Sequence, residues 1–180
     1  MSYAHIDNLY RAQDILLFRE CFALEKIHGT SAHVAWKDGR IQFQSGGEKH
    51  ERFVARFNEP ALIEAFGALD YESVIVYGEA YGGAQQGQSW RYGKELKFIA
   101  FEVQLGDLWL AVPQAADVVV KLGLEFVHYR KIPTDLVSIN AERDAPSEQA
   151  KRIGVVGVEP RVGIVLRPPI EVVKNYVERI

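Results

Sequence analysis

The sequence of 180 residues contains a single cysteine, Cys21. An internal disulfide is therefore excluded, and with it the class of small secreted domains that depend on a disulfide framework. We interpret this scarcity of cysteine as typical of a reducing compartment and expect a cytoplasmic location.

Long apolar runs are absent as well. The segment from Met1 to Tyr10 contains Asp7 and polar residues, and it lacks the apolar core of a secretory signal. The longest apolar runs are short, such as 115–120, which Asp117 interrupts. A membrane span needs ~20 consecutive apolar residues. We therefore expect no contact with a membrane.

A strong charge of one sign is also missing. Lys and Arg number 21 and Asp and Glu number 24, which gives a formal net charge of −3. This balance argues against a basic coat for nucleic acid and leaves a local basic groove open. With 48% hydrophobic and 25% charged residues, the chain has the composition of a globular protein. Its length and its lack of internal repeats predict one domain.

Most of the predicted elements are strands. Asp38-Gly39 and Gly106-Asp107 predict hairpin turns between two pairs of them. Apolar or alternating segments predict strands at 21–24, 31–36, 41–44, 73–77, 97–103, 108–112, 124–129 and 163–166.

Helices are fewer. One is predicted after the N-cap Asn58, with Pro60 in its first turn; a second at 114–122; and a third from Ser147 to Gly154. Strands grouped in hairpins with a few helices between them indicate an α+β domain with antiparallel β-sheets and flanking helices.

The first candidate for chemistry is the stretch from Glu25 to Ser31, Glu-Lys-Ile-His-Gly-Thr-Ser. Lys26 follows an apolar strand, where desolvation would favour its neutral, nucleophilic amine. Gly29 would let a ligand approach the backbone closely. Taken alone, the pattern favours a strand-end lysine that reaches into solvent.

Two further stretches contain carboxylates beside strands. Glu79 follows a buried strand in a loop with three glycines, an arrangement that suits a ribose hydroxyl or a divalent metal; the alternative is a plain hairpin turn. Phe101 can stack on a nucleobase, or it can be an ordinary core aromatic, and Glu102 follows it. A fourth stretch, from Val162 to Arg167, predicts a buried strand that ends at a positively charged residue.

In this order, the four stretches resemble the nucleotidyltransferase motifs of covalent ATP-dependent ligases, most closely the RNA ligase family typified by phage T4 RNA ligase 2 and the kinetoplastid editing ligases. The Lys-x-His-Gly form at Lys26 points to RNA ligases, whereas DNA ligases usually have Asp where His28 stands. A DNA ligase or a capping-type nucleotidyltransferase is the alternative within the class. The resemblance runs from about Leu24 to Val173, with motif I at Glu25 to Thr30, motif III at Tyr77 to Gly83, motif IIIa at Phe98 to Val103 and motif IV at Val162 to Arg167.

The resemblance implies a nucleotidyltransferase fold, an ATP-grasp-like ligase adenylation domain over residues 1–180. Lys26 would attack the α-phosphate of ATP and become lysyl-AMP, which then serves to join RNA 5′-phosphate and 3′-hydroxyl ends. Mg²⁺ would assist. The resemblance assigns nucleotide binding to Glu25 and Ile27 at the adenine, through backbone or side chain, to His28 and Gly29, to Glu79 at the ribose and to Phe101 by stacking; it assigns metal binding to Glu79 and Glu102.

The chain also departs from the family pattern. Val162 stands where motif IV has a metal-supporting glutamate, and Glu159 would replace it only if the loop bulges. A motif Ia arginine is missing, and Lys49, His50 or Arg52 are the candidates to fill in. The motif V lysine pair is missing, since we interpret the lone Lys174 as a turn residue, and we therefore expect a domain that is incomplete at its C-terminus. These departures keep open a catalytically impaired module that binds nucleotide or RNA without ligation.

Overall fold

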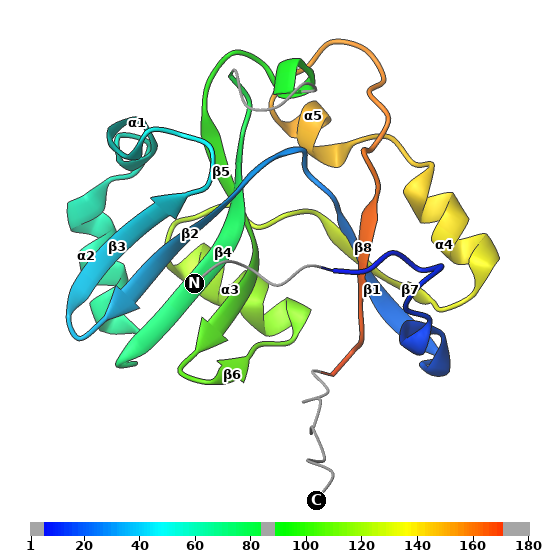
Figure 1. The fold of residues 1–180 in the computed structure, drawn as a ribbon, viewed down its shortest axis with the longest axis horizontal. Coiled ribbons are helices and arrows are strands. Elements are labelled where there is room, and N and C mark those ends of the chain that lie inside the picture. Colours follow the sequence, from blue (N-terminus) through cyan, green and yellow to red (C-terminus); the bar gives the residue numbers. More distant parts are fainter. Residues whose placement is uncertain (1–5, 84–88, 171–180) are drawn as a thin grey trace, which may run out of the picture.

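The computed structural model describes residues 6–83 and 89–170 of the chain. Its strands form two antiparallel sheets that lie side by side, with helices packed around them (Figure 1). The larger sheet has the strand order β3-β2-β4-β5-β6, and the smaller sheet has the order β7-β1-β8. The prediction of an α+β domain with antiparallel sheets and flanking helices is confirmed.

The strand bounds follow the predicted segments in most places. The Asp38-Gly39 turn has positive φ at both residues, 50° and 75°, as a two-residue hairpin of this kind requires. The strands are β1 (Glu20–Glu25), β2 (Gly29–Lys37), β3 (Arg40–Ser45), β4 (Ser73–Tyr81), β5 (Lys97–Leu105), β6 (Leu108–Trp109), β7 (Tyr129–Pro133) and β8 (Ile164–Arg167).

Two of the helices begin at side-chain caps that the sequence predicts. The side chain of Asn58 accepts a hydrogen bond from the N–H of Ala61, and that of Ser147 accepts one from the N–H of Ala150. Both predicted caps are confirmed. The α-helices are α1 (His50–Val54), α2 (Glu59–Ala68), α3 (Val112–Lys121), α4 (Leu136–Arg143) and α5 (Glu148–Arg152), with short 3₁₀ turns at Asp14–Leu17 and Ser89–Tyr92.

Some expectations about these elements were wrong. The strand expected at 124–129 begins only at Tyr129, because the apolar residues Phe126 and Val127 are buried beside β5, where Phe126 makes a single bridge to Ala100. The strand expected at 108–112 ends early, since helix α3 starts at Val112. Helices α1 and α4 were not predicted.

The two faces of the larger sheet have different roles. Val74 and Val76 of β4 are fully buried on one face, in the main core with residues of α1, α2 and α3. For example, Trp36 of β2 stacks on Phe66 of α2 with 5.9 Å between ring centroids. Because side chains alternate along a strand, Glu79 of β4 lies on the opposite face. On that face Glu79 is half-buried between Tyr77 and Tyr81, which are both buried.

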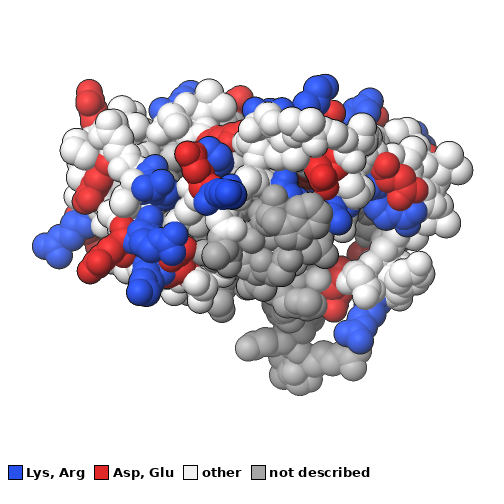
Figure 2. Space-filling model, turned by 90° about the horizontal axis from the view of Figure 1, so that it is seen from above, with Lys and Arg blue, Asp and Glu red and all other residues white. Residues whose placement is uncertain are grey.

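The surface carries both signs of charge. Seen from above, Lys and Arg side chains are interspersed with Asp and Glu side chains rather than gathered in one basic patch (Figure 2). Within the described residues, no helix is both long and apolar enough to cross a membrane.

Candidate active site

Lys26 lies where the chain passes from the smaller sheet to the larger one. It directly follows β1, and three residues later β2 begins at Gly29. The backbone N–H of Lys26 donates a hydrogen bond to the carbonyl oxygen of Gly163, 3.0 Å away, which extends the pairing of Glu25 with Ile164. Motifs I and IV of the resemblance are thus in contact through their backbones.

The side chain of Lys26 is exposed. This agrees with the interpretation that the local pattern favours, a strand-end lysine that reaches into solvent, because the burial of β1 ends at Glu25. The exposed side chain of Lys26 lies at the junction between the two sheets, where it is accessible to a ligand.

Glu79 comes to this junction from β4. Strand β4 continues to Tyr81 and does not end at Tyr77 as predicted, so Glu79 lies within the strand and not in the glycine-rich loop. Its Oε1 atom accepts a hydrogen bond from the backbone N–H of Gly29 at 3.1 Å. Burial raises the pKa of Glu79 to about 7, against the opposing effects of the Lys26 charge and of the Gly29 hydrogen bond. The structure therefore brings together the predicted residues Lys26, Gly29 and Glu79.

Gly29 is needed for this contact. A Cβ atom at position 29 would lie 2.2 Å from the carbonyl oxygen of Ala80 and 3.0 Å from Cγ of Glu79. Any larger residue would force β2 away from β4. The glycine predicted to admit a ligand thus also permits a close approach of the protein's own strands.

Ile27 and His28 complete the turn after Lys26. The Ile27 side chain is buried in the main core, so this residue can contact a nucleotide only through its backbone. His28 is half-buried, and its backbone is hydrogen-bonded to the phenol of Tyr92.

Glu25 points away from Lys26, as expected for neighbours at a strand end. Its buried carboxylate accepts hydrogen bonds from Oγ of Ser147 at 2.5 Å and from the backbone N–H groups of Glu148 and Gln149 at 3.0 and 3.3 Å. The Glu25 side chain is thus held at the start of α5 and is not available to an adenine. We expected Glu25 to contact adenine through its backbone or its side chain, and of these only the backbone remains available.

Phe101 occupies an irregular position on β5. Tyr77 pairs with Glu102 and Gly78 pairs with Ala100, so Phe101 is the extra residue of a β-bulge. Bulges change the direction of side chains and are frequent beside active sites. Phe101 is partly buried against the core and keeps some exposure.

Glu102 is buried and forms an ion pair with Arg167 of β8. A metal at Glu102 would have to displace this guanidinium. In the parts of the chain that the structure describes, no group of three or more His, Cys, Asp or Glu side chains could hold a metal ion. The geometry thus favours a structural ion pair at Glu102 over the predicted metal ligand.

The predicted replacements for missing family residues are placed elsewhere. Glu159, the candidate to replace the glutamate at Val162, lies 4.0 Å from Arg91 in an ion pair. Lys49, His50 and Arg52 lie at the start of α1, which packs against β3, and Arg52 forms an ion pair with Glu48 at 3.4 Å. Lys174, expected to be a turn residue where motif V is missing, falls outside the described residues.

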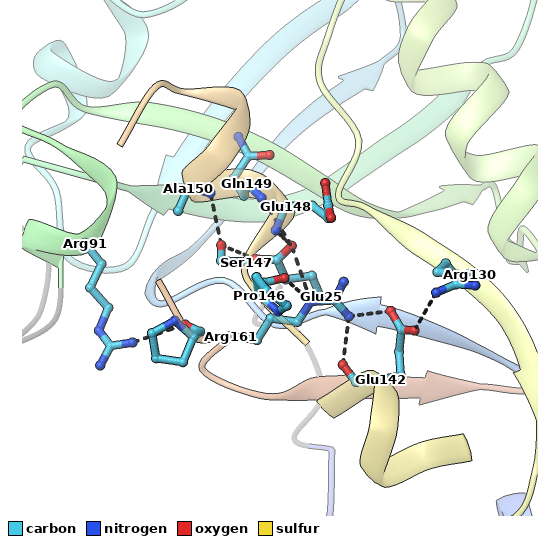
Figure 3. A network of polar contacts seen from close by, with 11 residues as sticks. Glu25, Arg91, Arg130, Glu142, Pro146, Ser147, Glu148, Gln149, Ala150 and Arg161 are labelled. Atoms are coloured by element: carbon cyan, nitrogen blue, oxygen red, sulfur yellow. Dashed lines mark hydrogen bonds and ion pairs between the residues drawn. The ribbon is translucent and has the colours of Figure 1, made fainter. Parts of the chain in front are cut away.

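The sequence did not predict a buried polar network around Glu25, the residue before Lys26 (Figure 3). Nη1 of Arg161 donates to Oε1 of Glu142 at 2.5 Å and to its carbonyl oxygen at 3.0 Å. Nε of Arg161 donates to the carbonyl oxygen of Pro146 at 3.1 Å and lies 3.9 Å from Oε2 of Glu25. The only sequence signal was a cation directly before motif IV, which gives no indication of its partners.

Comparison with known proteins agrees with this arrangement. The family model described as RNA ligase matches residues 19–179. A comparison with curated sequences gives no match. Among solved structures, a variant of the Naegleria gruberi RNA ligase with AMP and Mn superposes with a TM-score of 0.73 at 17% identity, covering 94% of this chain and 53% of that one.

Other structures of that ligase give a similar result. A second variant with AMP and Mn, and the ligase with PPi, each have a TM-score of 0.66 and 18% identity, and cover 84% of this chain and 47% of the other. The chain thus shares the fold of these ligases and spans about half of their length. Since the family model covers most of the chain, this protein belongs to the RNA ligase family.

Proposed function

We propose that this chain is the adenylation part of an ATP-dependent RNA ligase, with Lys26 as its nucleophile. The observation that carries the proposal is the convergence of Lys26, Gly29 and Glu79 at the junction of the two sheets, in a chain of the RNA ligase family. Solved ligases of the same fold contain AMP, ATP or PPi. AMP is the group that such a reaction transfers, ATP is its substrate and PPi is its leaving group.

The reaction is a transfer of AMP to the protein. The neutral Nζ of Lys26 attacks the α-phosphorus of ATP, and a P–N bond forms. The bond from that phosphorus to the oxygen bridging the α- and β-phosphates breaks, pyrophosphate leaves with the electron pair, and the amine proton passes to solvent. Because the side chain of Lys26 is exposed while its backbone is held by the hydrogen bond to Gly163, the amine can reach the phosphate.

Other residues of the site bind and orient the nucleotide. The backbone at Glu25 and Ile27 borders the adenine, and Phe101 stacks on it. Glu79 accepts a hydrogen bond from the ribose. Burial of Glu79 strengthens such a contact, since a carboxylate removed from water gains more from each hydrogen bond.

The site also suits a divalent metal in part. Mg²⁺ is usually held by one or two carboxylates together with substrate phosphates, and Glu79 supplies one carboxylate near Lys26. When bound there, the metal would neutralise charge on the ATP phosphates.

A second candidate function is a module that binds nucleotide without forming the adduct. Val162 favours it, since it directly precedes Gly163, the backbone partner of Lys26, and offers no oxygen where the family pattern has a glutamate. The ion pair of Glu102 with Arg167 also engages a second carboxylate that the metal would need.

The wider function follows from the proposed chemistry. In an RNA ligase, AMP passes from the lysine to an RNA 5′-phosphate, and a 3′-hydroxyl then displaces it, which would serve RNA repair. We also keep the proposal of a cytoplasmic location, which the single buried, free cysteine supports.

The two candidates are separated by intact-mass measurement after incubation with ATP and Mg²⁺, together with ATP binding by calorimetry. The ligase proposal predicts a gain of one AMP, whereas ATP binding without that gain supports the nucleotide-binding module. The variant Val162→Glu sharpens the comparison: a higher adduct yield identifies the missing carboxylate as the limitation, and an unchanged yield places the limitation elsewhere.

A further inference from the structure

Arg161, Glu25 and Glu142 form a buried cluster of charged side chains next to Lys26. We assign these side chains no contact with the nucleotide, and they do not face solvent. Arg161, Glu25 and Glu142 each have at most 5% of their side chain exposed. They come from three places in the sequence: the end of β1, helix α4 and the residue two positions before Gly163. Burying such charges costs free energy unless they are paired and hydrogen-bonded.

The cluster satisfies that condition almost completely. Arg161 donates to two carbonyl oxygens and to one carboxylate, and Glu25 accepts three hydrogen bonds from the start of α5. Glu142 receives a further contact from Arg130 at 3.3 Å, whose side chain is 65% exposed. Figure 3 shows Arg161 between the two carboxylates.

The position of the cluster links it to the nucleophile. Glu25 immediately precedes Lys26, and Arg161 lies two residues before Gly163, which accepts the hydrogen bond from the N–H of Lys26. The Arg161–Glu25 pair, with 3.9 Å between Nε and Oε2, therefore joins the same two segments as that hydrogen bond. Neither segment can shift along the other without breaking both contacts.

We propose that Arg161 is a positioning residue for Lys26: it fixes the backbone on both sides of the Lys26–Gly163 hydrogen bond and so sets where the amine stands. This inference rests on the proposed function for its catalytic consequence. A displacement of about 1 Å in a reacting group can cost ~100-fold in rate. Arg161 itself touches no substrate.

The test compares Arg161→Lys with Arg130→Gln. Lysine keeps the charge and loses the planar fork that contacts several partners at once. Arg130→Gln removes the exposed contact to the same Glu142 and serves as the matched control. For each variant, single-turnover AMP transfer gives the maximal rate, and titration gives the ATP affinity. Hydrogen exchange, followed by mass spectrometry on the protein without ATP, reports the amide of Lys26.

We expect Arg161→Lys to lower the maximal rate of AMP transfer by about 10- to 100-fold, with ATP affinity within ~3-fold of wild type, and to speed exchange of the Lys26 amide. Arg130→Gln should change none of these. If Arg161→Lys does not fold, the double variant Arg161→Gln/Glu142→Gln, which leaves the net charge of the cluster unchanged, takes its place with the same expectations.

Two results overturn the inference. One is AMP transfer at the wild-type rate in the Arg161 variant, and the other is unchanged exchange at Lys26. If wild type forms no adduct at all, the proposed function fails, and the exchange measurement alone then decides whether Arg161 holds the Lys26 segment.

Discussion

Oε1 of Glu79 accepts a hydrogen bond from the backbone N–H of Gly29 at 3.1 Å. This contact ties a partly buried carboxylate to the turn that follows Lys26. Burial, opposed by the Lys26 charge and by this hydrogen bond, raises the pKa of Glu79 from 4.5 to about 7. The protein therefore holds at its centre an acid that titrates near neutral pH.

A pH-dependent stability follows from this pKa. The pKa of Glu79 is higher in the folded state than in the unfolded state, so the folded state binds the proton of this carboxyl more tightly. The contribution of Glu79 to stability is therefore fully present below pH 4.5 and is lost as the pH rises to about 7. Glu79→Gln should remove this pH dependence and exceed the stability of wild type above pH 7, by on the order of 1–3 kcal/mol. Urea unfolding at several pH values between 4.5 and 8 measures it. Parallel profiles for both proteins would contradict the assigned titration.

Gly29→Ala should destabilise the protein. The added Cβ would lie 2.2 Å from the carbonyl oxygen of Ala80, and backbone cannot yield as a flexible side chain can. We expect a loss of about 2–4 kcal/mol in the free energy of unfolding. The control is Gly67→Ala in α2, where a Cβ meets nothing within 4 Å and alanine favours the helix. Equal effects of the two substitutions in thermal unfolding would show that Gly29 is not at a close approach of strands.

Phe101→Leu should weaken ATP binding while changing stability little. Leucine keeps the apolar contact with the core and loses the aromatic face, and stacking on a base contributes about 1–3 kcal/mol. We expect a Kd for ATP that rises by roughly 5- to 100-fold. Calorimetric titration measures it. If the affinity is unchanged and the stability falls, Phe101 is a core residue alone.

The ion pair of Glu102 with Arg167 should stabilise the fold without any metal. Removing one partner takes away the buried counter-charge of the other, and Glu102→Gln is expected to cost about 3–5 kcal/mol. Arg167→Met should cost as much, and Glu102→Leu with Arg167→Met should recover part of the loss. Urea unfolding with and without Mg²⁺ tests this. A stability loss that appears only when Mg²⁺ is present would instead restore Glu102 as a metal ligand.

The sequence predicts this fold well where the signals are local. The Asp38-Gly39 turn, the Asn58 cap and the Ser147 cap depend on a few adjacent residues, and each forms as expected. The apolar segment 124–129 was misassigned because burial beside β5 and strand pairing produce the same composition. Helix α4 was missed because much of its surface is exposed, as at Leu136 and Val137.

The site residues, too, were predicted where local motifs identify them and missed where only the tertiary structure pairs them. Lys26, Gly29 and Glu79 were found because their motifs resemble those of a known family, and strand pairing then brings them together. The partners of Glu25 and Glu102 were not found. Ser147 and Arg161 lie more than a hundred residues from Glu25, and Arg167 lies far along the chain from Glu102, so only the tertiary structure pairs them.

The measurement that tests the central claim most directly is peptide mapping of the protein after reaction with ATP and Mg²⁺. Wild type should carry one AMP on the peptide that contains Lys26, and pyrophosphate added afterwards should remove it. Lys26→Ala should carry none while still binding ATP. AMP on a different lysine, or an adduct that persists in Lys26→Ala, would contradict the account.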